Sequence, residues 1–403
     1  METGRSGPRS VAIVSSIAYS LANFRGPLIA AMVAAGVRVY AMAPDHDENT
    51  RRQVRILGAE PVDISLERTG MRPVRDLLDI WRLAGMLRRL KPDATFSYFV
   101  KPVIYGSLAA KLADVPLRYA LVAGLGYVYT PETSRENFKR RALRTLVSFL
   151  YRVAFKACRR VFFQNSDDVA QFVESRFIAP DRVVLLNGSG VELDRFKLVP
   201  RPTSRPVFLL MARLLREKGI LEYVEAARIV RRRHPAARFL LLGGTDPNPG
   251  ALSREEVEAW VTEGVIEWPG HVDDVRPWIE ASSVYVLPSY REGKPRSTQE
   301  AMAAGLPVIT TDAPGCRGTV DEGVNGFLVP IRDGSALAAA MLRFVEDPTL
   351  IETMGKESRR LAEERFDVHE INALILREMG IPTVSSPGVG GASETDFPAI
   401  RLS

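Results

Sequence analysis

The chain has 403 residues, of which 46% are hydrophobic and 25% charged. This composition excludes a fibrous or disordered protein, and the length predicts two domains of about 150–200 residues each. The net charge of +6 is uneven, because residues 1–200 carry 30 Lys+Arg and 19 Asp+Glu whereas the remainder carries 24 and 29. We therefore expect the first half alone to meet a polyanion, which leaves nucleic acid, anionic lipid head groups and a pyrophosphate open.

Apolar, β-branched runs alternate with helical patterns through the first half. The opening residues 1–22 contain an apolar stretch broken by serines, which we interpret as a first buried strand in an unprocessed chain. Strands are predicted at 11–15, 37–43, 94–99, 118–123, 160–164 and 182–186. Helical segments such as 74–90 lie between them, and this alternation predicts a parallel sheet with right-handed crossovers.

The helical segment 138–158 is basic and has an apolar stripe. The stripe consists of Leu143, Leu146, Val147, Leu150 and Ala154, and the opposite face carries Arg141, Arg144, Arg152 and Lys156. One interpretation is a crossover helix with a solvated basic face, and the other is a basic face on anionic head groups. We expect both: the stripe packs on the sheet and the cations face a membrane. No stretch reaches the roughly 18 continuous apolar residues of a membrane span.

A second strand–helix series begins after the Pro-rich stretch at 199–206. Strands are predicted in "VFLLMA", "RFLLLGG", "VIEWPG", "VYVLPS", "PVITT" and "GFLVP". The prediction is a first domain at 1–198, a linker at 199–206, a second domain at 207–365, a helix at 366–380 that crosses back to the first domain, and a disordered tail at 381–403. Two doubly wound α/β domains would thus face each other across a cleft, where ligands of such folds bind.

The stretch "REGKPRSTQEAMAAG" joins a predicted strand to a predicted helix. Unpaired amides at such a turn, together with the helix dipole, favour an anion, and Gly293 and Pro295 would shape the loop around a phosphate. The pattern lacks the P-loop signature, so a diphosphate is expected and ATP hydrolysis of the P-loop kind is not. Ser297 and Glu300 also fit a capping box, and Glu292 fits a solvated loop charge.

Metal and disulfide signals are weak. Cys158 and Cys316 are far apart, and the four histidines show no zinc spacing. The segment "DHD" at 45–47 follows the second strand, far in sequence from the diphosphate loop, and is interpreted as a chance match to a metal-binding pattern. No metal and no cofactor are expected.

Several segments together resemble a known family. The segment that begins "SYREGKPRSTQEAMAAGLPVITT" resembles the E-x7-E element of family 4 retaining glycosyltransferases, which have the GT-B fold, and "VFLLMARLLREKGI" resembles their strand–Arg-x4-Lys element. "NFRGPL", "KPVIYGSLAAKLADVP", "FFQNSDD" and "NGSGVELDRF" are similar to the subgroup that extends undecaprenyl-diphosphate-linked saccharides, such as the bacillosamine-linked N-acetylgalactosamine transferases. The likeness runs from about residue 10 to 380.

On the donor side, the resemblance implies catalytic roles for Glu292, Arg213 and Lys218. The two cations would neutralise the donor diphosphate, and Glu292 would contact the transferred sugar. Donor contacts are implied for Gly293, Lys294, Pro295, Glu300, Gly270 and His271. Glu300 would accept the ribose hydroxyls, and a loop reading of His271 stays open.

On the acceptor side, the motifs suggest contacts by Arg25, Lys101, Gly124, Gly126 and Tyr127. Ordinary surface or turn roles remain open for each of them. Family members commonly carry a histidine before "GLG", near the reacting sugar, and this chain has Ala123 there.

The sequence as a whole predicts a peripheral enzyme on the cytoplasmic face of the cell membrane. It would move a sugar, most simply an N-acetylhexosamine, from a UDP-sugar to a polyprenyl-diphosphate-linked saccharide with retention and without a metal. The alternatives are a soluble or different lipid acceptor and a catalytically silent nucleotide-sugar binder. A nucleic-acid-binding protein is disfavoured because the basic residues come without interleaved aromatics or a binding motif.

Overall fold

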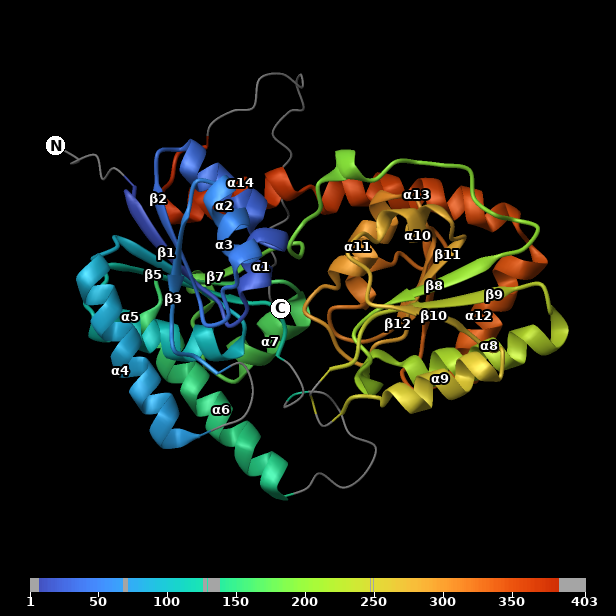
Figure 1. Cartoon of the computed structure of the whole chain (residues 1–403), viewed down its shortest axis with the longest axis horizontal. Coiled ribbons are helices and arrows are strands. Elements are labelled where there is room, and N and C mark those ends of the chain that lie inside the picture. Colours follow the sequence, from blue (N-terminus) through green and yellow to red (C-terminus); the bar gives the residue numbers. More distant parts are fainter. Residues whose placement is uncertain are drawn as a thin grey trace.

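The computed structural model describes residues 7–67, 72–125, 129, 138–246, 248 and 250–383, with the backbone only for 138–140. It has two lobes, each built on a parallel sheet (Figure 1). The first sheet has seven strands in the order β3-β2-β1-β4-β5-β6-β7, and the second has six in the order β10-β9-β8-β11-β12-β13. Both orders reverse direction beside the first strand, which confirms the predicted pair of doubly wound α/β domains.

The first sheet comprises β1 (Ser10–Val14), β2 (Arg38–Ala43), β3 (Glu60–Asp63), β4 (Ala94–Tyr98), β5 (Leu117–Val122), β6 (Arg160–Phe163) and β7 (Val183–Leu185). Its helices are α1 (Ala18–Asn23), α2 (Gly26–Ala34), α3 (Glu48–Ile56), α4 (Pro73–Leu90), the π-helical turn η1 (Pro102–Gly106), α5 (Ser107–Leu112), α6 (Phe138–Ala157) and α7 (Ser166–Glu174). The predicted strands are all present. The sequence prediction missed β3, because this short edge strand is only partly buried and its sequence, EPVD, shows no apolar run.

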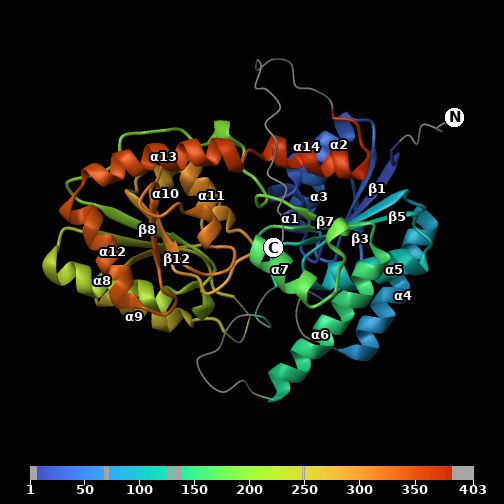
Figure 2. The ribbon, with the colours of Figure 1, turned by 180° about the vertical axis from the view of Figure 1, so that it is seen from behind.

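The first domain has one apolar layer on each face of its sheet. Helices α4 to α7 and η1 cover one face, with Phe155, Phe163 and Phe172 in the core between them. Helices α1 to α3 cover the other face around Leu28, Ile29 and Met32. Both views show this sandwich in the N-terminal lobe (Figures 1 and 2). The loops that connect strands to helices therefore lie at the ends of the strands, where their side chains can contact a ligand.

The second sheet comprises β8 (Val207–Met211), β9 (Arg238–Leu242), β10 (Glu267–Gly270), β11 (Val284–Leu287), β12 (Val308–Thr311) and β13 (Gly326–Val329). Its helices are α8 (Ile220–Arg233), α9 (Arg254–Thr262), α10 (Arg276–Glu280), α11 (Arg296–Ala303), α12 (Gly334–Glu346) and α13 (Thr349–Arg365). The central strands β8 and β11 are entirely buried, as expected for a sheet covered on both faces.

The last described helix, α14 (Val368–Met379), leaves the second domain and packs on α2 of the first. Figure 1 shows α13 and α14 running in succession across both lobes. Ile375 and Leu376 enter the same apolar layer as Leu28 and Met32. The chain thus closes its first domain with residues from its C-terminal part.

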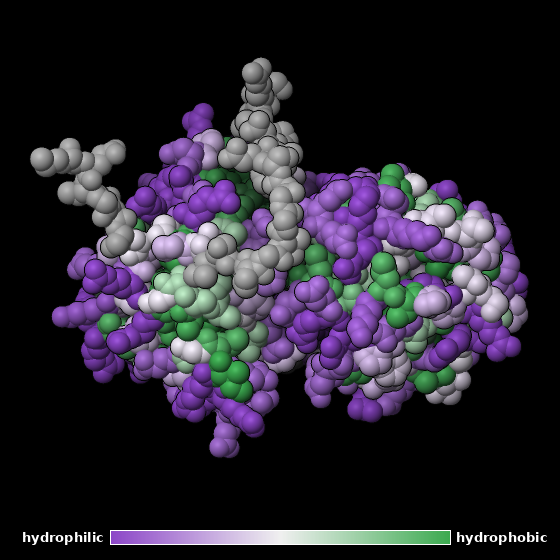
Figure 3. Space-filling model, turned by 90° about the horizontal axis from the view of Figure 1, so that it is seen from above, coloured by the Kyte–Doolittle hydropathy of each residue, from purple (hydrophilic) through white to green (hydrophobic). Residues whose placement is uncertain are grey.

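The surface is mostly hydrophilic in the view from above, with hydrophobic residues in smaller groups on both lobes (Figure 3).

Candidate active site

The functional candidates of the second domain lie where its strand order reverses. Strands β8 and β11 are neighbours, whereas the chain runs outward through β9 and β10 between them. Arg213 and Lys218 follow β8, and Glu292 follows β11. Loops at the carboxyl ends of these two strands form the crevice that ligands occupy in open α/β sheets. Segments eighty residues apart thus converge at one point.

Lys218 and Glu292 form an ion pair at this point, with Nζ of the lysine donating to Oε1 of the glutamate. Their side chains are only 17% and 15% exposed. Gly219 follows with φ 72°, and a Cβ there would overlap the carbonyl of Pro288, so the turn that presents Lys218 requires glycine. Lysine has three donor hydrogens, so two remain for a second anionic partner beside Glu292.

Arg213 stands at the mouth of the same crevice. Its Nη1 donates to Oδ2 of Asp246 at 2.5 Å; the arginine side chain is about half exposed and the aspartate is buried. The guanidinium is thereby held in place while its other N–H groups stay available to solvent or to an anion.

Helix α11 begins at Arg296, two residues earlier than a capping box on Ser297 requires. Pro295 is the N-cap, and no side chain caps this helix. The predicted capping box is therefore wrong. The Ser297 hydroxyl instead accepts a hydrogen bond from the Tyr285 hydroxyl at 2.6 Å, and Glu300 pairs with Arg296 at 2.9 Å.

Glu300 is a buried carboxylate beside a cation that links the two domains. Burial raises the pKa of Glu300 above its usual value, and the Arg296 guanidinium opposes this shift. Arg296 also donates through Nη1 to the carbonyl of Asn23 at 2.7 Å and lies over the Phe24 ring. Sequence reasoning missed Arg296, although its spacing of four residues before Glu300 on a helix was a usable signal.

A cavity of about 410 Å³ lies between the domains and contains three of the predicted residues, Arg213, Glu300 and His271. The first domain contributes the end of α1 and the residues that follow it, and the second contributes the loops after β8, β9 and β10 and the start of α11. The lining residues not foreseen from sequence include Tyr19, Asn23, Phe24, Glu192, Arg195 and Arg296. Its position at the carboxyl ends of the strands makes this cavity the candidate active site.

His271 is an exposed loop residue at the rim of this cavity. Its side chain is 70% exposed and its Nε2 lies 3.7 Å from Asp273. Gly270 precedes it with φ 86°, and its carbonyl accepts from the amide of Gly243. The loop that carries both residues thus lies along the cavity, and a contact with donor remains a prediction for each.

The two domains touch backbone to backbone at Gly293 and Gly124. A Cβ on Gly293 would overlap the carbonyl of Ala123, and one on Gly124 would lie 3.1 Å from the amide of Gly293. Asn165 of the first domain donates to the carbonyl of Gly293 at 2.7 Å. A glycine is therefore required at position 293 because the backbone of the first domain lies against it. This contact accounts for the glycine whether or not a phosphate binds there.

Lys294 lies outside the lining of this cavity. Its Nζ lies 5.6 Å from the centroid of the Phe366 ring. Burial lowers the pKa of Lys294 to about 8, and the nearby Arg365 adds to this effect. The side chain lies beside an aromatic ring at the domain junction, and the donor contact of Lys294 remains a prediction.

The acceptor candidates have different surroundings. Arg25 is 3% exposed and lies 5.3 Å from the centroid of the Tyr98 ring, with no acidic partner among the described residues. Its Nε has no hydrogen-bond partner in the described part of the chain, and burial lowers its pKa to about 10. Lys101, in contrast, pairs at 3.1 Å with the buried Asp76 of α4. Gly126 and Tyr127 lie outside the described residues.

The predicted apolar stripe of α6 is confirmed at four of its five residues, because Val147 and Ala154 are buried and Leu143 and Leu150 pack against the core. Val147, Tyr151 and Phe155 are buried, and both aromatic rings pack against Phe172. Leu146, which was expected in the core, is 45% exposed because the aromatic residues take the inward positions. Arg141, Arg152 and Lys156 are exposed, and Arg144 is partly buried. No described helix is long and apolar enough to cross a membrane.

The "DHD" segment has structural roles. Asp45 accepts from the amide of Ala18 at 2.6 Å, and Asp47 caps α3 through a reciprocal pair with Thr50. Within the described ranges, no group of three or more His, Cys, Asp or Glu side chains could hold a metal ion. Cys158 and Cys316 are both buried free thiols.

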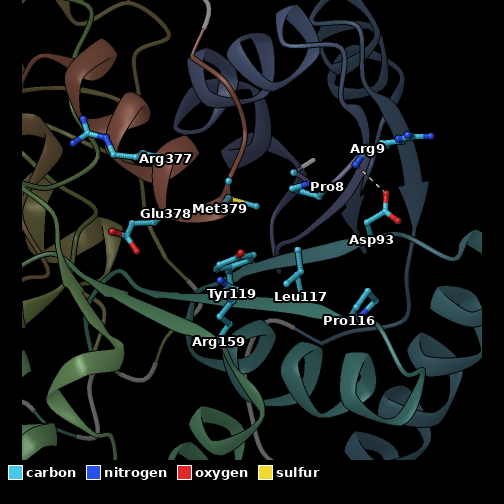
Figure 4. Close-up of a pocket in the computed structure, with 12 residues that line it drawn as sticks. Pro8, Arg9, Asp93, Pro116, Leu117, Tyr119, Arg159, Arg377, Glu378 and Met379 are labelled. Carbon is cyan, nitrogen blue, oxygen red and sulfur yellow. Dashed lines mark hydrogen bonds between the residues drawn. The ribbon is translucent and has the colours of Figure 1, made fainter. Parts of the chain in front are cut away.

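A larger hollow of about 790 Å³ lies elsewhere, at the amino ends of β1, β4 and β5 beside the end of α14 (Figure 4). Asp93 there accepts the amide of Arg9 at 2.9 Å, and Glu378 pairs with Arg160. It faces the sheet edge opposite to the one where parallel α/β folds bind ligands. We therefore do not assign the predicted chemistry to it.

Comparisons with known proteins agree with this geometry. Residues 22–189 match the family model described as glycosyl transferase 4-like domain, and residues 205–347 match glycosyl transferases group 1. The chain is 27% identical over 361 residues to the N,N'-diacetylbacillosaminyl-diphospho-undecaprenol alpha-1,3-N-acetylgalactosaminyltransferase of Campylobacter jejuni, covering 86% of this chain and 92% of that protein. It is 24% identical over 308 residues to the UDP-Gal:alpha-D-GlcNAc-diphosphoundecaprenol alpha-1,3-galactosyltransferase of Escherichia coli, covering 73% and 77%.

Solved structures show the same fold. Sucrose-phosphate synthase from Thermosynechococcus elongatus superposes with a TM-score of 0.75 at 21% identity, covering 92% of this chain and 98% of that one. The Anabaena HepE protein, solved with UDP and glucose, gives 0.70 at 17%, covering 92% and 98%. With two lobes of this fold and a family model matched by each, the chain belongs to the group 1, glycosyl transferase 4-like family of GT-B glycosyltransferases.

Proposed function

We propose that the protein transfers a sugar from a UDP-sugar to a polyprenyl-diphosphate-linked saccharide, with retention at the anomeric carbon and without a metal ion. N-acetylgalactosamine or another N-acetylhexosamine is the proposed sugar. The two relatives named above act, by their names, on undecaprenyl-diphosphate-linked acceptors, and together they support this acceptor class. The product would enter surface glycan or glycoprotein synthesis.

The observation that carries the proposal is the grouping of Lys218, Glu292 and Arg213 where β8 and β11 end. A nucleotide diphosphate bears several negative charges, and the two cations supply donors on one side of it. Glu300 then faces the neighbouring cavity, where its carboxylate suits a pair of ribose hydroxyls. In the proposed complex, one nucleotide sugar spans the cavity and the crevice.

The proposed step breaks the bond between the anomeric carbon and the UDP oxygen, and the electron pair leaves with UDP. The acceptor hydroxyl attacks from the same face and forms the new glycosidic bond. Its proton passes to the departing diphosphate. Lys218 and Arg213 stabilise the charge that grows on UDP, and Glu292 stabilises the positive charge at the sugar.

Arg25 supports an anionic second substrate. A buried guanidinium without an acidic partner is unfavourable, and an anion at this place would offset that penalty. The side chain lies in the first domain, next to the residues at the end of α1 that line the cavity. The acceptor pyrophosphate is the proposed partner.

Ala123 motivates a second candidate function, a nucleotide-sugar binder without turnover. Its carbonyl faces Gly293 and its side chain has no polar group, so it offers none of the chemistry of the histidine expected there. A soluble or different lipid acceptor is the further alternative.

One screen tests these possibilities. The protein is incubated with labelled UDP-N-acetylgalactosamine, UDP-N-acetylglucosamine or UDP-galactose and short prenyl-diphosphate sugars, with and without EDTA. The proposal expects a lipid-linked product with the donor's anomeric configuration by NMR and an unchanged rate in EDTA. Binding of the donor without product in any combination would favour the silent binder.

A further inference from the structure

Helix α4 has its polar and apolar residues on unexpected sides. Its only acidic residues, Asp76 and Asp79, are 5% and 1% exposed. Four large apolar residues point outward instead, and these are Val74 at 77%, Leu77 at 56%, Leu78 at 49% and Trp81 at 53% exposed. Their spacing places them on one helical face, which we call the α4 stripe. Soluble helices normally show the opposite arrangement.

The buried acids have partners, so this arrangement is built into the domain. Asp76 accepts from Lys101 and from the Tyr105 hydroxyl, both at 3.1 Å. Asp79 accepts from the Ser65 hydroxyl at 2.6 Å. The inward face of α4 is therefore fixed by these bonds and by its core leucines, and the helix cannot turn to hide the α4 stripe.

Helix α6 repeats the pattern nearby. It contains no acidic residue, and Leu146 and Phe149 are 45% and 60% exposed. A shallow hollow on its surface is lined by Arg141, Ala142, Thr145, Leu146 and Phe149. Helices α4 and α6 both pack against α5 and η1, which lie between them. Figures 1 and 2 show both helices on the lower side of the N-terminal lobe, with their first turns at its lower end.

These exposed apolar residues lie toward the edge of the sheet that carries the candidate site. A helix that follows a parallel strand starts at the carboxyl end of that strand, so α4 begins beyond β3 and α6 beyond β5. The α4 stripe spans roughly 10 Å along the first half of its helix. A surface that covered both helices would thus border the opening between the domains.

The charged residues around the α4 stripe indicate what kind of partner it contacts. Arg72, Arg75 and Arg82 of this region are 69%, 50% and 64% exposed, and Arg89 on the same helix is exposed too. Arg72 and Arg75 share Glu67, which precedes the helix, and Arg82 lies 3.8 Å from the buried Asp79, so the region keeps an excess of positive charge. Exposed apolar residues flanked by arginine, with a tryptophan among them and no exposed acid on either helix, suit the boundary of an anionic bilayer. A protein partner would not require this one sign of charge.

We propose that the outer faces of α4 and α6 insert into an anionic lipid surface, the α4 stripe with Leu146 and Phe149 entering the boundary between head groups and acyl chains. This surface deepens the proposed function, on which it rests for its purpose: it would hold the open cleft beside a lipid-linked acceptor. Insertion of apolar side chains from α4 is distinct from the electrostatic contact expected of the α6 arginines alone.

Vesicle sedimentation of the full chain tests the proposal without any substrate. Binding to phosphatidylcholine vesicles that contain phosphatidylglycerol should fall at least about tenfold in the double variant Leu77→Glu, Trp81→Glu. Ile56→Glu is the matched control, since Ile56 is 74% exposed on α3, which covers the opposite face of the sheet. Equal binding by the double variant and the control would overturn the proposal.

Trp81 gives a second readout, which starts from the wild-type chain and needs only a conservative aromatic substitution as its comparison. It is the only tryptophan in the first half of the chain. Lipids brominated along the acyl chain should quench part of the wild-type fluorescence, and Trp81→Phe should lose that quenched part while it still binds vesicles. Quenching that is unchanged by Trp81→Phe, or absent in the bound wild type, would show that α4 stays outside the bilayer.

Two further outcomes separate this inference from its alternatives. A dimer in light scattering that Leu77→Glu dissociates, without vesicle binding, would assign the surface to a second copy and overturn the lipid proposal. Transfer to a short water-soluble prenyl-diphosphate sugar should be unchanged in Leu77→Glu. If transfer occurs but vesicle binding fails, the lipid-binding surface is wrong and the proposed function stands. If vesicles bind but no transfer occurs, the lipid-binding surface stands and the proposed function is wrong.

Discussion

Lys218 and Glu292 neutralise each other before any substrate arrives. The pair is largely shielded from water, so removal of either partner leaves an uncompensated charge beside the proposed diphosphate. Substitution of Lys218 or Glu292 therefore has two separable effects. It changes the charge balance of the site before substrate binds, and it changes the stabilisation of the departing diphosphate. Arg213, anchored by Asp246, adds a second cation whose position is fixed in the same way.

We expect Lys218→Ala and Glu292→Ala each to lower the turnover number at least about tenfold, because stabilisation of the developing charges is lost. Steady-state transfer assays measure this, with circular dichroism to confirm the fold. Arg228→Ala is the control, since it breaks an ion pair with Glu263 of comparable length on the exposed side of the same domain. Near-normal turnover in both site variants would refute their roles.

Glu300 should make nucleotide binding sensitive to acid. A carboxyl whose pKa is raised on folding gains its proton more easily in the folded chain, so acid favours the protonated folded form. The ionised form is the better acceptor for ribose hydroxyls. UDP affinity should therefore fall as the pH drops, starting above the range of an ordinary glutamate. Calorimetric titrations at several pH values test this, and Glu300→Gln should remove the dependence.

Lys294 should destabilise the fold at neutral pH. Its pKa is lowered to about 8, so between pH 8 and the usual lysine range the unfolded chain binds more protons and stability rises with pH. Lys294→Met should raise the free energy of unfolding at pH 7 by about 1–2 kcal/mol and flatten this rise. Urea unfolding at pH 7 and pH 9 tests it, with the exposed Lys356→Met expected to change neither value.

At the scale of elements, the loop after β11 is held against the first domain by two ion pairs and a backbone contact. Asp168 of α7 is buried and pairs with Arg291, and Asp167 pairs with Arg317. Gly293, two residues after Arg291, lies against Ala123. The loop that presents Glu292 is thus held by the opposite domain, and its geometry depends on how the domains meet.

Gly293→Ala should therefore impair transfer while each domain stays folded. The added methyl overlaps the carbonyl of Ala123, which must shift, and small displacements of catalytic groups are expensive. We expect the turnover number to fall at least about tenfold with an unchanged far-UV circular dichroism spectrum. Gly85→Ala, where an added methyl meets nothing, serves as control. Unaltered transfer would mean that the junction opens during the reaction.

The regular elements could be predicted from sequence because their runs are strongly apolar. The strands β8 and β11 consist of buried residues throughout, whereas β3 could not be found from its four residues. The stripe of α6 was predicted correctly except at Leu146, and the prediction left out Tyr151 and Phe155, which pack against an aromatic ring from α7. Tertiary partners of this kind are not visible in one helix.

The candidate site was only partly predictable, for a related reason. Arg213, Glu292 and Glu300 belong to local motifs, and each motif marks its own strand end. Arg296, Asn23 and Phe24 meet only because two domains approach each other, so no single segment shows their contact. The capping box was mistaken because Pro295, and not Ser297, precedes the helix.

For the molecule as a whole, α14 ties the C-terminal part of the chain to the first domain, because it packs on α2. Its buried residues that meet the first domain are Ile371, Ile375, Leu376 and Met379. Burial of four such side chains contributes roughly 6–12 kcal/mol. This is comparable to the entire stability of a typical domain.

Truncation after Arg365 should therefore prevent the first domain from folding stably. We expect an insoluble product, or a first domain whose thermal transition is lost. Truncation after Thr383 keeps α14 and should leave the melting temperature within a few degrees of the full chain. Calorimetry of both products decides, and a stable, cooperatively folded product from the shorter chain would show that α14 is dispensable.

The backbone contact between the glycines at 124 and 293 also bears on how such enzymes can be recombined. Because main-chain atoms form this contact, it requires a glycine on each side and a fixed backbone path, and it sets no requirement on the side chains elsewhere in either domain. A hybrid that joins this first half to the second half of another family member needs those glycines and the two acid–guanidinium pairs beside them. We expect such hybrids to fold, and to inherit acceptor choice from one parent and donor choice from the other.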